Sequence, residues 1–169
     1  MNAILNTWNA LDTDAAVAAL LSCCAAHRWA QEVAVHRPYA TADDLFKTAD
    51  CVWATMEEPD WMEAFRAHPR IGERKAVHAI AQSAQWSRQE QSAAEAARKD
   101  VLAKLADGNL RYEQLFGFTY IVCATGKSAE EMLQILERRL ASNRQSELRE
   151  AAEQQRQITQ IRLIKWLEI

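Results

Sequence analysis

The sequence DWMEAFRAHPRIGE, residues 60–73, is the stretch around which the rest of the chain is organised. Asp60 is a favoured N-cap residue, and Glu63 three positions later gives the spacing of a capping box. The apolar residues between and after them recur at helical period. A residue that precedes a proline is disfavoured in the α conformation, so we expect the helix to end at His68, before Pro69. The stretch therefore predicts a short helix with an imidazole fixed at its end.

Two interpretations of His68 remain open on the residues alone. A histidine at the C-terminus of a helix interacts favourably with the helix dipole and needs no further role. Alternatively, an imidazole held between a helix end, a rigid Pro69 and a permissive Gly72 is a positioned acid or base, because histidine titrates near neutral pH.

The composition is that of a globular domain. At 169 residues the chain is long enough for one core, and we expect a single domain spanning residues 1–169. A net charge of -3 with no basic stripe argues against nucleic acid as a partner. No apolar run reaches the length of a membrane span, and the N-terminus lacks the pattern of a signal peptide. We therefore expect a cytoplasmic protein with no membrane partner.

Capping residues and helix breakers predict the fold class. With only 4 glycines and 3 prolines the chain has too few turn residues for a many-stranded β protein. We expect an all-α fold, a single compact bundle of about eight or nine helices. The expected helices lie at residues 3–8, 13–35 with a break, 41 to Pro59, 60–68, 75–82, 87–106, 109–124, 128–140 and 145–167.

Two of these expectations rest on weak signals. Gly108 after Asp107 is typical of a helix C-terminus, with Asn109 capping the next helix. Residues 116–124 are apolar and aromatic almost all round, and periodicity cannot separate a buried helix from a buried strand there. The lack of an evident partner strand favours a helix.

The start of the helix at residue 87 also carries two interpretations. Ser87 and Glu90 have the spacing of a capping box, which is a structural role. However, Gln91 stands where an apolar residue would complete a hydrophobic staple, and a helix N-terminus presents free backbone N–H groups to an oxygen-rich ligand.

Arg162 is similarly open. It shares a helix face with Ile158 and Trp166, four residues before and after it. Its side chain either extends along that face to water or is held inward, where its planar guanidinium would bind a carboxylate.

Two other kinds of site are not supported. Gly126-Lys127-Ser128 lacks the earlier glycine of a phosphate-binding loop, and Ser128 with Glu131 instead predicts a helix start. No metal site is predicted, because the histidines and cysteines lack ligand spacing. We expect the cysteines to be reduced and mostly buried. The four histidines are His27, His36, His68 and His78, and the four cysteines are Cys23, Cys24, Cys51 and Cys123.

Several segments between about residue 20 and residue 163 resemble, in order, the 2-oxo-4-hydroxy-4-carboxy-5-ureidoimidazoline (OHCU) decarboxylases, a family of urate degradation. Each segment is modest alone, and their order makes the resemblance specific. The segments are HPRIG at 68–72, SRQEQ at 87–91, FGFTYIVCATGKS at 116–128, RLASN at 139–143 and IRL at 161–163.

The resemblance implies an all-helical carboxy-lyase that needs no cofactor, forms a homodimer and converts OHCU to (S)-allantoin and carbon dioxide. It implies that His68, Glu90 and Arg162 are catalytic. It also implies a set of substrate-binding residues, in part through the main chain, and no metal ligand. That set is Pro69, Ser87, Arg88, Gln89, Glu90, Gln91, Ile121, Val122, Cys123, Ala124, Thr125 and Arg162.

This chemistry suits these residue types. The enzyme must orient a carboxylate, for which Arg162 is suited, and deliver one proton to one face, for which His68 is suited. A second function class stays open: a non-catalytic helical module that binds a purine-breakdown product in the same pocket.

Overall fold

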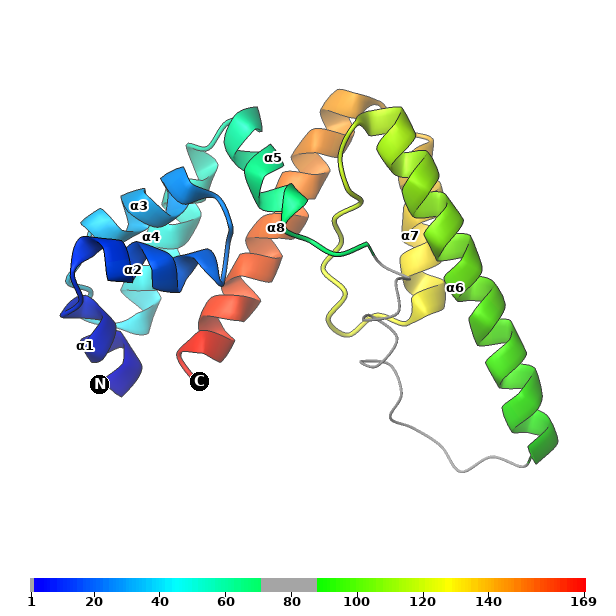
Figure 1. Ribbon diagram of the computed structural model, residues 1–169, viewed down its shortest axis with the longest axis horizontal. Helices are drawn as coiled ribbons and strands as arrows, with labels where there is room; N and C mark the ends of the chain where they lie inside the picture. The colour runs from blue at the N-terminus through cyan, green and yellow to red at the C-terminus, as the bar shows by residue number, and fades with distance from the viewer. Residues whose placement is uncertain (1, 71–87) are drawn as a thin grey trace. The chain divides into compact units, whose positions relative to one another are not determined.

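The computed structural model describes residues 2–70 and 88–169, and for residues 88–97 the backbone alone. Within these residues the secondary structure is helical, with no strand, so the all-α prediction is confirmed (Figure 1). The helices are α1 (Ala3–Asn9), α2 (Thr13–Leu21), α3 (His27–Val35), α4 (Ala42–Ala54), α5 (Glu58–Arg66), α6 (Arg88–Phe116), α7 (Ala129–Leu140) and α8 (Arg144–Trp166). The helix predicted at 75–82 and the cap predicted at Ser87 lie outside the described residues.

The contacts within the chain divide it into two units. Unit 1 comprises Met1–Ala67 and Ala152–Ile169, and unit 2 comprises His68–Ala151. Helix α8 contributes residues to both units. None of the helices in the described part of the chain is long and apolar enough to cross a membrane.

Buried tryptophans join the helices of unit 1. Each indole N–H donates to a backbone carbonyl of another helix, so each ring is both packed in the core and fixed in orientation. The three bonds run from Trp8 to Ala16 (3.0 Å), from Trp29 to Ala49 (3.1 Å) and from Trp53 to Ala152 (2.9 Å).

The two ends of unit 1 are joined directly. The Asn2 side chain caps α1 by accepting from the Leu5 N–H at 3.0 Å, and it donates to the Leu167 carbonyl at 2.8 Å. One polar side chain thus satisfies free groups at the start of α1 and past the end of α8.

Most predicted helix starts agree with the structure. The break between α2 and α3 is present, and Thr41 and Ser128 each form a capping box at a predicted helix start. The start of α5 differs. Glu57 is its N-cap, and the Asp60 carboxylate accepts from the Glu57 N–H at 3.0 Å. Pro59 therefore lies in the first turn of α5, where its missing N–H costs nothing, and Asp60 is not the N-cap. The helix ends at Arg66, two residues before the predicted end at His68.

Helix α6 continues through Gly108, so the predicted helix end there is wrong. A Cβ on Gly108 would lie 2.6 Å from Cδ2 of Leu136 in α7. The glycine therefore allows α6 and α7 to pack closely side by side (Figure 1). Asn109 does not begin a new helix, because its side-chain amide donates to the Leu105 carbonyl one turn earlier, at 2.7 Å.

The helix predicted over residues 116–124 is also wrong beyond Phe116. After Gly117, whose φ is +81°, the chain runs without regular secondary structure to the start of α7. Phe118 and Tyr120 are buried against Tyr112, with ring centroids 5.7 and 5.3 Å from it. These tertiary contacts stabilise a buried irregular segment, which local periodicity cannot reveal.

Candidate functional site

His68 lies in unit 2, directly after α5 and its C-cap Ala67. The histidine is half-buried, whereas Pro69 and Arg70 are exposed. Arg70 donates from Nε and Nη2 to the two carboxylate oxygens of Glu113 in α6, at 2.7 and 2.6 Å. The hydrogen bonds from Arg70 hold the pKa of the Glu113 carboxyl below its ordinary value. The segment that carries His68 is thus attached to α6.

Arg162 lies in unit 1, on α8. Its side chain is half-buried, and Nη1 donates to the Cys23 carbonyl at 3.2 Å. Among the described residues the Arg162 guanidinium has no carboxylate partner. Most of its N–H donors therefore remain available for an anion.

The thiols next to Arg162 do not neutralise it. Burial raises the pKa of Cys24 to about 11, against the opposing hydrogen bonds and the charge of Arg162. Burial likewise raises the pKa of Cys23. Both cysteines are free thiols, so they stay protonated at neutral pH, and the positive charge of Arg162 is left uncompensated by them.

The segment from Ile121 to Thr125 follows α6 in unit 2. Ile121, Val122 and Cys123 are buried, and the last two residues are exposed. The Ile121 carbonyl accepts from Arg139 Nη1 at 2.6 Å, and the Cys123 carbonyl accepts from Lys127 Nζ at 2.7 Å. These two carbonyls are therefore satisfied by side chains in place of a helix or sheet, and the Ala124 carbonyl accepts from the Lys127 N–H at 3.0 Å.

The remaining predicted residues lie at the start of α6. Arg88, Gln89, Glu90 and Gln91 form its first turn, and Ser87 lies outside the described residues. At about 1.5 Å per residue, the 23 positions of α6 between Glu90 and Glu113 span about 35 Å. Because Arg70 contacts Glu113, the described contacts do not bring Glu90 to His68.

Unit 2 contains a buried ionic network that was not predicted from the sequence. Arg139 donates from Nε to Glu147 at 2.7 Å and from Nη2 to the Tyr112 hydroxyl at 3.0 Å. Tyr112 in turn donates to Glu147 at 2.7 Å, and burial raises its pKa, so it stays protonated. The sequence does contain one sign of this network. Arg139 lies on the apolar face of α7, three residues after Leu136.

The described residues contain no group of three His, Cys, Asp or Glu side chains that could hold a metal ion. His27 contacts the Glu63 carboxylate at 2.7 Å, and His36 contacts the Glu32 carbonyl at 2.7 Å. His78 lies outside the described residues. These two contacts give His27 and His36 structural roles.

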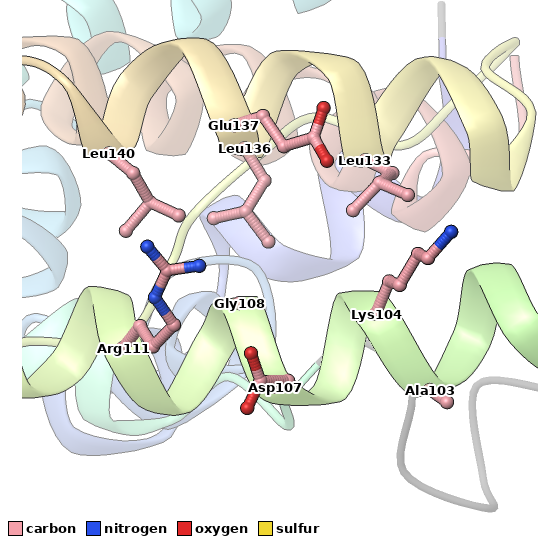
Figure 2. A pocket seen from close by; sticks show the side chains of 9 residues that line it. All are labelled: Ala103, Lys104, Asp107, Gly108, Arg111, Leu133, Leu136, Glu137 and Leu140. Carbon is pink, nitrogen blue, oxygen red and sulfur yellow. The ribbon is translucent and has the colours of Figure 1, made fainter.

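A cavity of about 410 Å³ lies between α6 and α7 (Figure 2). Arg111 and Lys104 of α6 extend toward leucines of α7 across it. None of the predicted site residues lines this cavity, so it is separate from the candidate site. Its lining is Ala103, Lys104, Asp107, Gly108, Arg111, Leu133, Leu136, Glu137 and Leu140.

Solved structures share this helical fold. A structure described as OHCU decarboxylase in the presence of (S)-allantoin is 30% identical, with a TM-score of 0.73 over 88% of this chain and 96% of that chain. A structure of (S)-allantoin synthase, 15% identical, has a TM-score of 0.67 over 96% of this chain and 53% of that chain, and supports the fold alone.

The sequence identifies the family. The OHCU decarboxylase family model matches residues 9–164, so the chain belongs to the OHCU decarboxylase family. It is 33% identical to the uric acid degradation bifunctional protein TTL of Arabidopsis thaliana over 85% of this chain and 44% of that protein. It is 24% identical to the OHCU decarboxylase of Haloferax volcanii over 94% of this chain and 93% of that protein. The chain thus spans less than half of the bifunctional relative.

Proposed function

We propose that this chain is a cofactor-independent carboxy-lyase that converts OHCU to (S)-allantoin and carbon dioxide in urate degradation. Family membership supports the reaction class. The observation that carries the proposal is Arg162, a half-buried guanidinium with no carboxylate partner among the described residues. A substrate that carries a carboxylate supplies the missing partner, with the fork geometry that arginine favours.

The substrate itself contains the acceptor for the electron pair that decarboxylation leaves behind. Its carboxylated ring carbon lies next to a C=N bond, so the electron pair of the breaking C–C bond moves into the ring as carbon dioxide departs. The carboxylate must stand out of the ring plane for that bond to overlap the π system, and we assign this orientation to Arg162. The family resemblance also implies substrate contacts from Glu90 and Gln91, but Glu90 lies about 35 Å along α6 from Glu113, so we assign no step of the reaction to them.

The neighbouring ring carbon, which belonged to the C=N bond and carries the ureido group, then takes up a proton on one face, and the hydroxyl of the decarboxylated carbon becomes a carbonyl. We assign this proton to His68, because histidine titrates near neutral pH and because Arg70 and Pro69 restrict the chain next to it. Delivery to a single face gives the S product. The main chain from Ile121 to Thr125 is proposed to bind a substrate oxygen, since backbone N–H groups suit developing negative charge.

The deciding experiment generates OHCU enzymatically from urate and follows its ultraviolet and circular-dichroism decay with and without the protein. Positioned acids contribute about 10²–10⁴-fold, so we expect His68→Asn to lose activity on that order while remaining folded. If solvent protonates the intermediate in this variant, its allantoin will be racemic. His36→Asn is the matched control, because His36 is exposed and contacts only a carbonyl in the described structure.

A folded His68→Asn protein with a near-normal rate and pure S product would remove His68 from the mechanism. A wild-type protein that binds (S)-allantoin in calorimetry but leaves OHCU decay unchanged would be a binding module instead of an enzyme.

We also propose that the chain acts in the cytoplasm as a homodimer. Leu110 and Leu115 on α6 are 50% and 57% exposed, and large apolar side chains of this kind are often covered by a partner. Light scattering coupled to size exclusion should give twice the mass of 19.2 kDa. A monomeric mass over the working concentration range would contradict the dimer.

A further inference from the structure

Two cationic side chains each tether one carbonyl of the segment that follows α6. Arg139 Nη1 donates to the Ile121 carbonyl at 2.6 Å, and Lys127 Nζ donates to the Cys123 carbonyl at 2.7 Å. The tethered carbonyls are two residues apart. The orientation of the two peptide planes is thus set from outside the segment.

The geometry of a trans peptide fixes where the neighbouring N–H groups point. The C=O of one residue and the N–H of the next lie on opposite sides of the bond. The cis peptide of the described chain is Arg37-Pro38, so both tethered peptides are trans. The N–H groups of Val122 and Ala124 therefore point away from Arg139 and Lys127. Among the described residues, neither N–H has an acceptor.

The arginine tether is rigid. The Arg139 side chain is 5% exposed and is held by Glu147 and Tyr112 at 2.7 and 3.0 Å. Its guanidinium also lies over the Tyr112 and Tyr120 rings, 5.5 and 5.0 Å from their centroids. A buried cation fixed on several sides is well suited to hold a main-chain group in one orientation.

We propose that Arg139 and Lys127 are positioning residues that hold the Val122 and Ala124 N–H groups as donors to oxygen atoms of the substrate. The inference rests on the proposed function, and it adds which donors act and what orients them. Donors fixed in advance stabilise negative charge that develops on an oxygen as the C–C bond breaks. A cation on the carbonyl side also polarises each peptide and strengthens its N–H as a donor.

Lys127 gives the cleaner test, because it is half-buried and is not part of the Arg139–Glu147 ion pair. Lys127→Met removes the ammonium and keeps the stem. We expect kcat to fall about tenfold with a smaller change in KM, less than the about 10²–10³-fold cost of deleting an oxyanion donor outright. Lys127→Arg should restore most of kcat, since it can still donate to the Cys123 carbonyl.

Lys104→Met is the matched control, because Lys104 is 59% exposed and pairs with Asp100 one turn away on α6. Its kcat and KM should equal those of the wild type. Arg139→Lys keeps a charge next to Glu147 but cannot reach three partners at once, so we expect it to lower kcat as well. If that variant fails to fold, the Lys127 series still decides.

Two results are separable. A wild-type protein that turns over OHCU, with Lys127→Met at wild-type kcat and KM, overturns the inference and leaves the proposed function standing. A wild-type protein without turnover overturns the proposed function, and calorimetry with (S)-allantoin then tests the donors: weaker binding by Lys127→Met supports them, and unchanged or absent binding overturns them.

Discussion

Arg70 and Glu113 are 43 positions apart and meet through two hydrogen bonds, one to each carboxylate oxygen. This fork-to-fork geometry restricts both side chains more than a single contact would. Because Arg70 stands two residues after His68, the pair restrains the segment that carries the proposed acid against the helix that carries Glu113.

We predict that Glu113→Gln weakens this restraint in a pH-dependent way. The folded pKa of Glu113 is lowered from 4.5, so the contribution of the pair is present above that pH and is lost as the pH falls below it. Arg70 is 47% exposed, so solvent screening limits the contribution to about 0.5 kcal/mol. Urea denaturation of both proteins at pH 7 and at pH 3 measures it. An equal difference at both pH values would contradict the role of the ion pair.

Replacing Arg162 should lower kcat/KM for the substrate while leaving the protein folded. Charged hydrogen bonds contribute about 1.5–3 kcal/mol, so Arg162→Gln should lower kcat/KM by about 10–150-fold. Arg162→Lys keeps the charge but loses the planar guanidinium. We expect its kcat/KM to lie between those of the wild type and Arg162→Gln. Arg149→Gln, an exposed position on the same helix, is the control. Equal loss in both glutamine variants would indicate a general charge effect.

Gly108→Ala should destabilise the protein although alanine favours helices. The added Cβ would lie 2.6 Å from Leu136, which is fully buried, and overpacking of this kind costs about 1–3 kcal/mol. The helix propensity gained is about 1 kcal/mol, so a net loss is expected. Thermal denaturation of Gly108→Ala, Leu136→Ala and the double variant completes a double-mutant cycle. The double variant should be more stable than the sum of the single losses, and simple additivity would exclude the contact.

The cysteines should differ in reactivity toward maleimide at neutral pH. Cys51 is exposed, whereas the other three are buried, and burial raises the pKa of Cys24 to about 11. Because the thiolate is the reactive form, we expect one thiol to react quickly in the folded protein. Cys51→Ser should abolish this fast phase. Mass spectrometry that finds Cys24 labelled first would contradict the buried environment.

Local signals predicted most of the helices. The capping boxes at Thr41 and Ser128 need only residues within one turn, and Pro69 was the local signal for a helix end near His68. Gly108 misled the prediction, because its role is set by Leu136 on another helix. Neither residue reveals the other from its place in the sequence.

The site likewise combines residues that the sequence indicates with contacts that only the folded chain shows. Residue types and their order along the chain pointed to His68 and Arg162. The tethering of Ile121 by Arg139 depends on Tyr112 and Glu147 from α6 and α8, which meet α7 only in the folded unit. An arginine on an apolar helix face is a usable sign that such partners exist, but it does not name them.

The hydrogen bond between Asn2 and Leu167 has a consequence for the order in which a nascent chain can fold. Unit 1 draws on both ends of the sequence, whereas unit 2 is continuous from His68 to Ala151. On the ribosome, the first five helices are synthesised well before the α8 residues that complete their core. Until those residues emerge, the first five helices keep part of their apolar surface exposed. All residues of unit 2 are synthesised before unit 1 is complete.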